Sequence, residues 1–364
     1  MSRLLRVELR RLWARRLTWW ALAGLLGVAC LTAFSVYGMA KPPSAEEVAW
    51  AQDAYEQELQ AWEETGEEQV AECAEGAESE GITPEEWGCD QLAPRREWFL
   101  PPEATFVRDE VDLDDQAALE AFAQDTGTTA DPEVAAVNSS IWNDWESGTP
   151  TIATSALAVL AVVFVLGVSF VTAETSSGAL GMWLTFEPRR RRVFWSKAAA
   201  AGLGTVPVTV LGVVASIGAV YAVYAAFGTL GNLTASRWAE IAGFGGRVVV
   251  AGVAFAMIGA ALGAMFRHAA AAAGAGAVLA VVGVVASSVA EAAQRWNPVV
   301  NITAWIESGA VYGRAVCGPS ESGVVECPWV EETVSQTQGG LYLLGLTLVL
   351  LLVAALVFRR RDVS

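Results

Sequence analysis

The sequence of residues 152–173 is IATSALAVLAVVFVLGVSFVTA, and residues 174–197 continue it as ETSSGALGMWLTFEPRRRRVFWSK. The first segment contains 22 residues and no Asp, Glu, Lys or Arg. A helix needs about 20 apolar residues to cross the roughly 30 Å hydrocarbon core of a bilayer. The segment therefore predicts a membrane-spanning helix, and a basic segment ending at Lys197 follows it.

Five further apolar runs of this length flank the first one along the chain. The run that contains Pro207 is counted as one span, because proline is tolerated in a membrane helix when neighbouring groups satisfy the freed carbonyl. The N-terminal run is too long for the apolar core of a cleavable signal peptide and has no convincing cleavage site after it. The sequence thus predicts an all-α polytopic membrane protein whose six transmembrane helices are residues 17–40, 151–173, 198–227, 244–266, 269–290 and 341–358.

Charge is distributed very unevenly along the 364 residues. The chain is 54% hydrophobic and 17% charged, yet its net charge is −17, an unusual combination for a soluble protein. Residues 41–150 hold 29 of the 40 acidic residues and 4 of the 23 Lys and Arg. The rest of the chain has 11 acids against 19 bases. An acidic polar insert therefore interrupts a basic, apolar frame.

The basic residues predict the orientation of the frame. If both termini are cytoplasmic, the inner segments hold 15 of the 23 Lys and Arg, as expected from the retention of positive charge on the cytoplasmic side. The acidic insert 41–150 and the loop 291–340 are then extracytoplasmic. Residues 1–16 form a predicted basic amphipathic helix that lies in the headgroup plane. The inner segments are residues 1–16, 174–197, 267–268 and 359–364.

Four of the five cysteines fall in the two large outer loops. An oxidising compartment permits disulfides there, and four cysteines allow three pairings. The two local pairings are favoured because each closes a short loop. A metal site is the alternative, but the chain has a single histidine, His268, and the cysteine spacing matches no common zinc pattern. The favoured pairs are Cys73 with Cys89 and Cys317 with Cys327.

The acidic insert is predicted to be a small, mainly helical domain. Ser44 and Glu47 have the spacing of a capping box, and a helix is expected from Glu46 to about Ala74. A second helix is expected from Asp114 to a stop at Gly127. Two interpretations of the acidity stay open: it attracts a cationic substrate or metal ions, or it is only the solvated surface of a cap.

The sequence disfavours ion pathways, proton relays and ATP hydrolysis, because the interiors of the spans lack charged residues and neither lysine belongs to a P-loop. Apart from Arg247, at the rim of the fourth span, the six apolar runs contain no Asp, Glu, Lys, Arg or His, whereas proton relays and ion pathways require ionisable residues within the membrane. The two lysines, Lys41 and Lys197, are followed by Pro and Ala, so neither completes a P-loop. The chain is therefore not expected to be an enzyme or to hydrolyse ATP itself. Apolar spans favour a hydrophobic or amphipathic substrate, such as a lipid, peptide or drug.

The segment between the second and third spans has a more specific residue pattern than a signal that only keeps positive charge on the cytoplasmic side. Positive-inside retention explains its arginines, but not the ordered series of acidic, Gly, Leu, Pro, basic and Lys residues. This series resembles the permease subunits of type-2 ATP-binding-cassette exporters, which also have an amphipathic N-terminal helix, six spans and variable outer loops. The residues that carry the resemblance, and that it implies couple to an ATPase, are Glu174, Gly178, Leu180, Leu184, Pro188, Arg189, Arg190, Arg191, Arg192 and Lys197.

The resemblance implies partners and a location. Two cytoplasmic ABC ATPase subunits would bind ATP and Mg, and no cofactor is expected in this chain. A second permease copy, or a related permease, would complete the pathway in contact with membrane lipid, and no nucleic acid is involved. The location implied is the plasma membrane, in a bacterium the inner membrane. Outer residues 291–340, with a corner at Trp296 to Pro298, would include a re-entrant hairpin.

Two other classes of protein stay open. A membrane-bound sensor or regulatory protein would bind a ligand with its acidic outer domain and recruit a signalling partner through the inner segments. A polytopic membrane enzyme is disfavoured, because no buried carboxylate pair and no Ser or His constellation is evident in the sequence. Co-purification with an ATPase would favour the exporter over both.

Overall fold

The computed structural model describes most of the chain as helix and divides it into two compact units. One unit contains residues 1–34, 151–220 and 233–364, and the other contains residues 35–150 and 221–232. The residues described are 2–79, 81–99, 116–126, 148–177, 179, 189–231, 233–266, 268–289, 291–315, 318–319, 325–326 and 329–360.

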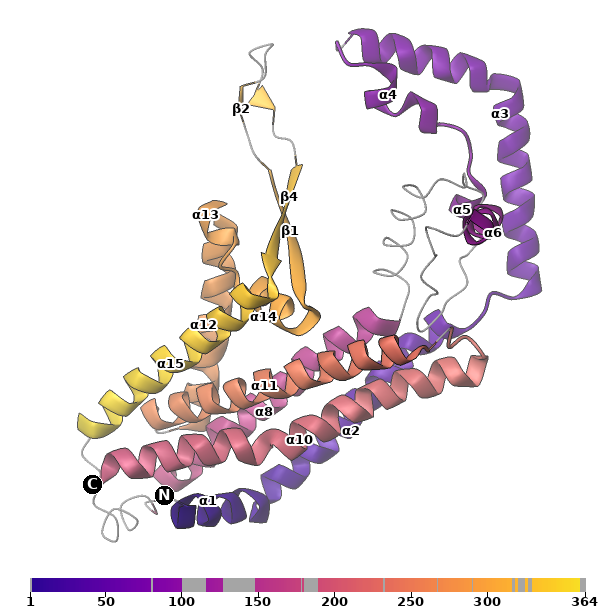
Figure 1. The fold of residues 1–364 in the computed structure, drawn as a ribbon. Coiled ribbons are helices and arrows are strands. Elements are labelled where there is room, and N and C mark those ends of the chain that lie inside the picture. Colours follow the sequence, from indigo (N-terminus) through magenta and orange to yellow (C-terminus); the bar gives the residue numbers. More distant parts are fainter. Residues whose placement is uncertain are drawn as a thin grey trace. The chain divides into compact units, whose positions relative to one another are not determined.

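Among the residues that the structure describes, six helices are long and apolar enough to cross a membrane, which confirms the predicted all-α polytopic fold. A separate basic helix, α1 (Ser2–Ala14), precedes the first of them. Apolar side chains remain exposed along these helices, among them Leu31, Leu211 and Leu352, as expected for surfaces that face lipid. The six helices are α2 (Arg16–Ala40), α8 (Gly148–Ser176), α10 (Arg190–Phe227), α11 (Ala235–Met265), α12 (Ala269–Val289) and α15 (Gln336–Arg360) (Figure 1).

The third membrane helix is longer than its apolar run. Helix α10 begins at Arg190, so three of the four consecutive arginines belong to its first turn. It continues through Pro207 to Phe227 without interruption. The basic end of the inner segment is thus part of a rigid helix and moves with the third span.

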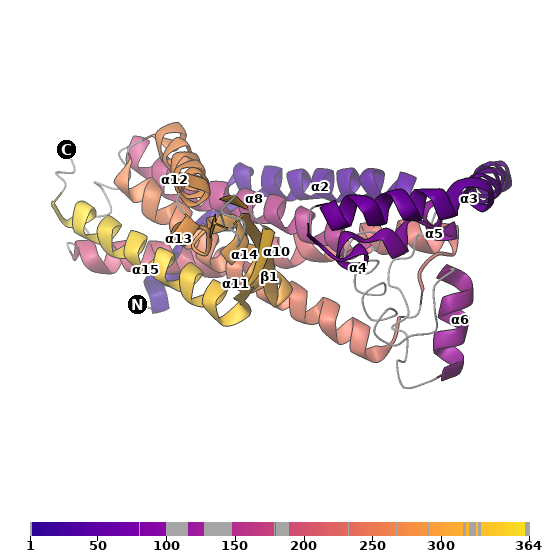
Figure 2. The same cartoon turned by 90° about the horizontal axis from the view of Figure 1, so that it is seen from above.

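Glycines allow α8 and α11 to approach closely within this chain. A Cβ atom on Gly259 would lie 2.2 Å from the carbonyl oxygen of Phe164, and one on Gly263 would lie 2.8 Å from that of Val168. Conversely, a Cβ on Gly167 of α8 would lie 2.1 Å from the Ala256 oxygen. These small residues serve close helix packing inside one chain. Helix α11 also packs against α12 and α15 (Figure 2).

The segment before the last span forms two short helices and a β-hairpin. Helix α13 (Glu291–Gln294) is followed by α14 (Pro298–Glu307), whose first residue is the proline of the predicted corner. Asn297 caps α14 by accepting a hydrogen bond from the amide of Val299 at 2.9 Å. Strands β1 (Gly309–Ala315) and β4 (Trp329–Ser335) then pair antiparallel, and beyond them β2 (Gly318–Pro319) pairs with β3 (Val325–Glu326). These strands were not predicted.

The second unit contains the acidic insert and is helical where it is described. Helix α3 (Ala45–Ser79) carries α4 (Pro84–Trp87), the 3₁₀ helix η1 (Cys89–Gln91) and α5 (Arg96–Phe99) along its length, and α6 (Gln116–Thr126) follows. The predicted capping box is present, because the Ser44 amide donates to Glu47 at 2.7 Å and the Glu47 amide donates to the Ser44 hydroxyl at 3.2 Å. These hydrogen bonds lower the pKa of Glu47.

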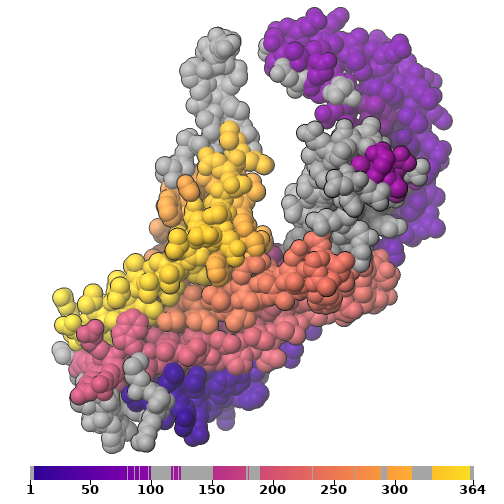
Figure 3. Space-filling view, viewed as in Figure 1, coloured from indigo at the N-terminus to yellow at the C-terminus, as the bar shows by residue number. Residues whose placement is uncertain are grey.

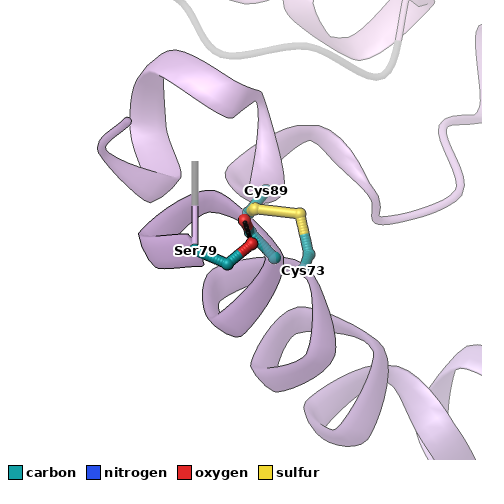
Figure 4. Close-up of a disulfide and its surroundings, with 4 residues drawn as sticks. Cys73, Ser79 and Cys89 are labelled. Atoms are coloured by element: carbon teal, nitrogen blue, oxygen red, sulfur yellow. Dashed lines mark hydrogen bonds between the residues drawn. A yellow bond between two sulfur atoms is a disulfide. The ribbon is translucent and has the colours of Figure 1, made fainter. Parts of the chain in front are cut away.

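The predicted disulfide between Cys73 and Cys89 is also present. It joins the end of α3 to η1, with the two Cα atoms 5.8 Å apart (Figure 4). Cys317 and Cys327 lie outside the described residues. The bridge therefore closes the turn through α4 and fixes it against the long helix.

Candidate functional site

Buried charges from three helices meet where α1 lies against the membrane bundle. Lys197, in the second turn of α10, donates to the two carboxylate oxygens of Glu8 at 3.0 and 3.2 Å. It also forms a short ion pair with Glu174, near the end of α8. The exposed fractions are only 2% for Glu8, 3% for Lys197 and 6% for Glu174. We call these three residues, with Arg11 and Arg15, the ion cluster.

The two arginines of the ion cluster lie on the more exposed side of Glu174. The Arg15 guanidinium is 3.6 Å from the Glu174 carboxylate, and that of Arg11 is 3.8 Å from it. Arg15 also donates to the backbone oxygen of Ser169 at 2.9 Å. Burial lowers the pKa of Arg15, and the nearby Glu174 and Glu8 oppose that effect. Glu174 thus contacts cations from both α10 and the N-terminal segment.

A break between α1 and α2 places Arg15 and Glu8 for these contacts. The chain leaves α1 after Ala14 and enters α2 at Arg16. The Thr18 hydroxyl donates to the Leu12 oxygen at 2.6 Å and so holds the bend. Because α1 is turned at this point, its inner face packs on α8 and α10, and it does not simply extend the first span (Figure 1).

An apolar layer surrounds the ion cluster. Leu12 of α1, Phe170 of α8 and Phe194 of α10 belong to one buried core, which also contains Phe358 at the end of α15. Gly204 lets α1 approach α10, because a Cβ there would lie 3.2 Å from side-chain atoms of Leu9 and Leu12. The Phe170 ring lies 5.5 Å from the Lys197 nitrogen. This core excludes water, which strengthens the ion pairs inside it.

The free energy that each buried charge of the ion cluster loses on leaving water is offset only when all of its partners are in place. A buried ion loses several kcal/mol of hydration free energy, and the loss is offset only when its partners are in place. Lys197 lies between two carboxylates, and Glu174 is further compensated by Arg11 and Arg15. Each helix that contributes a charge is therefore held in one position relative to the others.

The structure brings together two of the predicted coupling residues, Glu174 and Lys197. Arg189, Arg191 and Arg192 lie at the start of α10 with exposed side chains, and Arg190 beside them is partly buried. Gly178, Leu180, Leu184 and Pro188 lie outside the described residues. The arrangement thus combines a buried ion pair with an exposed basic turn directly before it.

Sequence reasoning missed Glu8, although a signal was available. The apolar face predicted for residues 1–16 contains Leu5, Leu9 and Leu12, and Glu8 has the spacing of the same face, three residues after Leu5 and four before Leu12. It is the only acidic residue among the first sixteen. An acid on the buried face of a basic helix indicates a cation on the surface to which the helix binds.

Six membrane-length helices, preceded by a basic helix that is ion-paired to their ends, define a multi-pass helical membrane protein. A family model described as "ABC-2 family transporter protein" matches residues 6–363. The chain therefore belongs to the ABC-2 transporter family and is a transmembrane component of an ABC transporter. No match was found among curated proteins or among solved structures.

Proposed function

We propose that this chain is the permease subunit of an ABC exporter and that α1 and the first turn of α10 together bind a separate cytoplasmic ATPase. The observation that carries the proposal is the ion cluster, which joins α1 to the ends of α8 and α10. A load applied to either α1 or α10 is therefore transmitted to both. The predicted coupling residues Gly178, Leu180, Leu184 and Pro188 complete the proposed contact.

The arginines at the start of α10 are available to bind acidic residues of a partner protein. Arg191 and Arg192 have exposed side chains on the first turn of α10, and the exposed Arg189 directly precedes that turn. Exposed arginines form bidentate pairs with carboxylates of a partner. A flexible basic loop would lose entropy on binding and would transmit little motion. In the proposed complex two ATPase subunits, each binding ATP and Mg, act on two permease copies or on this chain and a related permease.

The chemistry of the spans supports an amphipathic or hydrophobic cargo. The buried charges described above lie at the end of the bundle, and the apolar cores of the six spans contain no Asp, Glu, Lys or Arg. A path through such spans offers no counter-ion to a bare ion. Lipids, peptides and drugs that carry long apolar parts are compatible with it.

Co-purification tests the coupling assignment. The neighbouring reading frame is expected to encode a P-loop ATPase, and co-expression with a tagged permease should yield a stoichiometric complex. The triple variant Arg189→Gln/Arg191→Gln/Arg192→Gln should lose the ATPase, whereas Arg359→Gln/Arg360→Gln, which removes two charges from the end of α15, should retain it. A triple variant that still binds the ATPase in full would contradict the assignment.

The cargo is tested on the intact complex in lipid nanodiscs. Amphiphiles such as lysolipids or amphipathic peptides should stimulate ATP hydrolysis, and simple inorganic ions should not. Stimulation by ions alone would overturn the proposed cargo class, but it would leave the coupling assignment intact because co-purification tests that separately.

A further inference from the structure

A groove beside the outer end of α15 changes from polar to apolar along its length. Its volume is about 620 Å³, which lies within the usual range for small-ligand sites. Arg295, Ser335, Thr337 and Gln338 line one end. Trp296 lies next to Arg295 at this end, and the apolar part of the lining, along α15, consists of Leu341, Tyr342, Gly345, Leu346 and Val349. The order of these residues along α15 separates a polar end from an apolar channel.

Gly345 creates the apolar part of the groove. Leu341, Gly345 and Val349 are spaced four residues apart and share one stripe of α15. A Cβ atom on Gly345 would have no heavy atom within 4 Å, so the centre of the stripe is empty space. The side chains on either side of it, Leu341 and Val349, are 63% and 57% exposed. Figure 3 shows α15, in yellow, on the surface of its unit.

The groove has the length of one membrane leaflet. Eleven residues separate Gln338 from Val349, which at 1.5 Å per residue is about 16 Å along the helix. Half of the roughly 30 Å hydrocarbon core is about 15 Å. Trp296, 56% exposed at the polar end, has the amphipathic ring that is enriched at membrane interfaces. An acyl chain that fills the channel would therefore end near the middle of the bilayer.

The polar end is built around Arg295, which is fixed in position. Its Nε donates to the Gln338 side-chain oxygen at 2.8 Å, and the Gln338 amide donates back to the Arg295 backbone oxygen at 3.1 Å. Asn301 donates to the same backbone oxygen at 2.9 Å. Within the described residues no carboxylate forms an ion pair with Arg295, and its two terminal nitrogens make no hydrogen bond. A positioned guanidinium with two free nitrogens is complementary to a phosphate.

We propose that this groove binds an anionic phospholipid, with its phosphate on Arg295 and one acyl chain along Leu341, Gly345 and Val349. On the predicted orientation the lipid belongs to the extracytoplasmic leaflet, because the basic end of α15 at Arg359 is the opposite one. The bound lipid bridges the segment before α14 to the last span, so it stabilises the outer hairpin against α15. This site is independent of the proposed ATPase coupling.

Native mass spectrometry of the purified full chain tests the proposal. The protein is incubated with phosphatidylglycerol or with phosphatidylcholine of identical acyl chains, and the bound lipid is counted. Both lipids carry a phosphate, but the choline cation of phosphatidylcholine lies next to it and is repelled by the Arg295 guanidinium. We therefore expect phosphatidylglycerol, which has a net negative charge, to bind about tenfold more tightly. Inorganic phosphate at millimolar concentration should not displace it, since the apolar channel supplies the rest of the affinity. Displacement by inorganic phosphate, or equal binding of the two lipids, would overturn the proposal.

Substitutions at Arg295 and at Gly345 test the polar end and the apolar channel of the groove separately. Arg295→Gln should abolish the preference for phosphatidylglycerol, and Arg295→Lys should keep it. Gly345→Leu should fill the channel and weaken both lipids without disturbing packing, because the site is open. Gly218→Leu is the matched control, since Gly218 on α10 also has nothing within 4 Å of its Cβ position. Wild-type binding by either Arg295→Gln or Gly345→Leu would refute the assignment.

Discussion

Replacing Lys197 should destabilise the protein mainly because it leaves the Glu8 carboxylate without a cation. Glu8 is 2% exposed, and Lys197 is the only cation within ion-pair distance of it in the described part of the chain. Glu174 is less affected, because Arg15 at 3.6 Å and Arg11 at 3.8 Å remain. Removing one partner of a buried pair costs about 3–5 kcal/mol, so Lys197→Met should lower the free energy of unfolding by this amount.

A second substitution should restore much of that loss. In Glu8→Gln/Lys197→Met the buried charge is gone, and only the hydrogen bonds of a buried amide are left unmade, which costs about 1–3 kcal/mol. The double variant is therefore expected to be more stable than Lys197→Met alone. The corresponding interaction free energy between the two sites should be about 2 kcal/mol or more, at the upper part of the range for residues in contact.

The assay is reversible unfolding of the purified chain in mixed detergent micelles, followed by the fluorescence of its 15 tryptophans. Lys41→Met is the control, because Lys41 is the only other lysine and has an exposed side chain, and a surface change is usually within about 0.5 kcal/mol. Additive effects of Glu8→Gln and Lys197→Met would refute the reasoning. So would a loss below about 1 kcal/mol for Lys197→Met.

Three further predictions concern other parts of the chain. Replacing Cys73 and Cys89 by serine opens a bridge of sequence separation 16 and should destabilise the second unit, which contains the acidic insert, by about 3 kcal/mol, measured as faster proteolysis between α3 and α5. Gly259→Ala should cost about 1–3 kcal/mol of unfolding free energy because α8 must move away, whereas Gly246→Ala on the same helix, with nothing within 4 Å, should be neutral or stabilising in the same detergent titration. Hydrogen bonds from the capping serine lower the pKa of Glu47 below its usual 4.5, so the stabilisation is present above that pH and is lost as the pH falls through the lowered value. Amide exchange at the start of α3, corrected for intrinsic rates, should rise as the Glu47 carboxyl becomes protonated, and unchanged protection once that carboxyl is fully protonated would contradict this.

The six spans could be predicted because bilayer thickness imposes a length that is visible in composition alone. The sequence also indicated the cap at Ser44 and the bridge between Cys73 and Cys89, since both depend on residues close together in the chain. The start of α10 was less predictable. Its arginines precede the apolar run 198–227 but belong to the same helix from Arg190, and nothing in their hydropathy distinguishes a helical turn from a loop.

Contacts between distant segments were the least predictable part. The sequence singled out Glu174 and Lys197 through a family resemblance, but their partner Glu8 is 189 residues away from Lys197 and no local pattern joins the two. The hairpin of β1 and β4 was missed for a related reason. Residues 309–315 read GAVYGRA and residues 329–335 read WVEETVS. Neither segment shows the regular alternation of apolar and polar residues that predicts a half-buried strand, although Val334 of β4 is buried.

The position of the ion cluster indicates what it contributes beyond stability. A buried ion pair is often no more stable than an apolar replacement, and its best attested use is to specify register. Each residue turns a helix by about 100°, so a slip of α1 by one position would turn Glu8 away from Lys197 and leave Glu174 as the carboxylate partner of that buried lysine. The cluster thus fixes α1 on α8 and α10 in one register, which is what a coupling element requires. The variant Glu8→Gln/Lys197→Met, with much of its stability restored, should still assemble with the ATPase but lose stimulation of ATP hydrolysis by amphiphiles. Full stimulation in that variant would show that register is not the role of these charges.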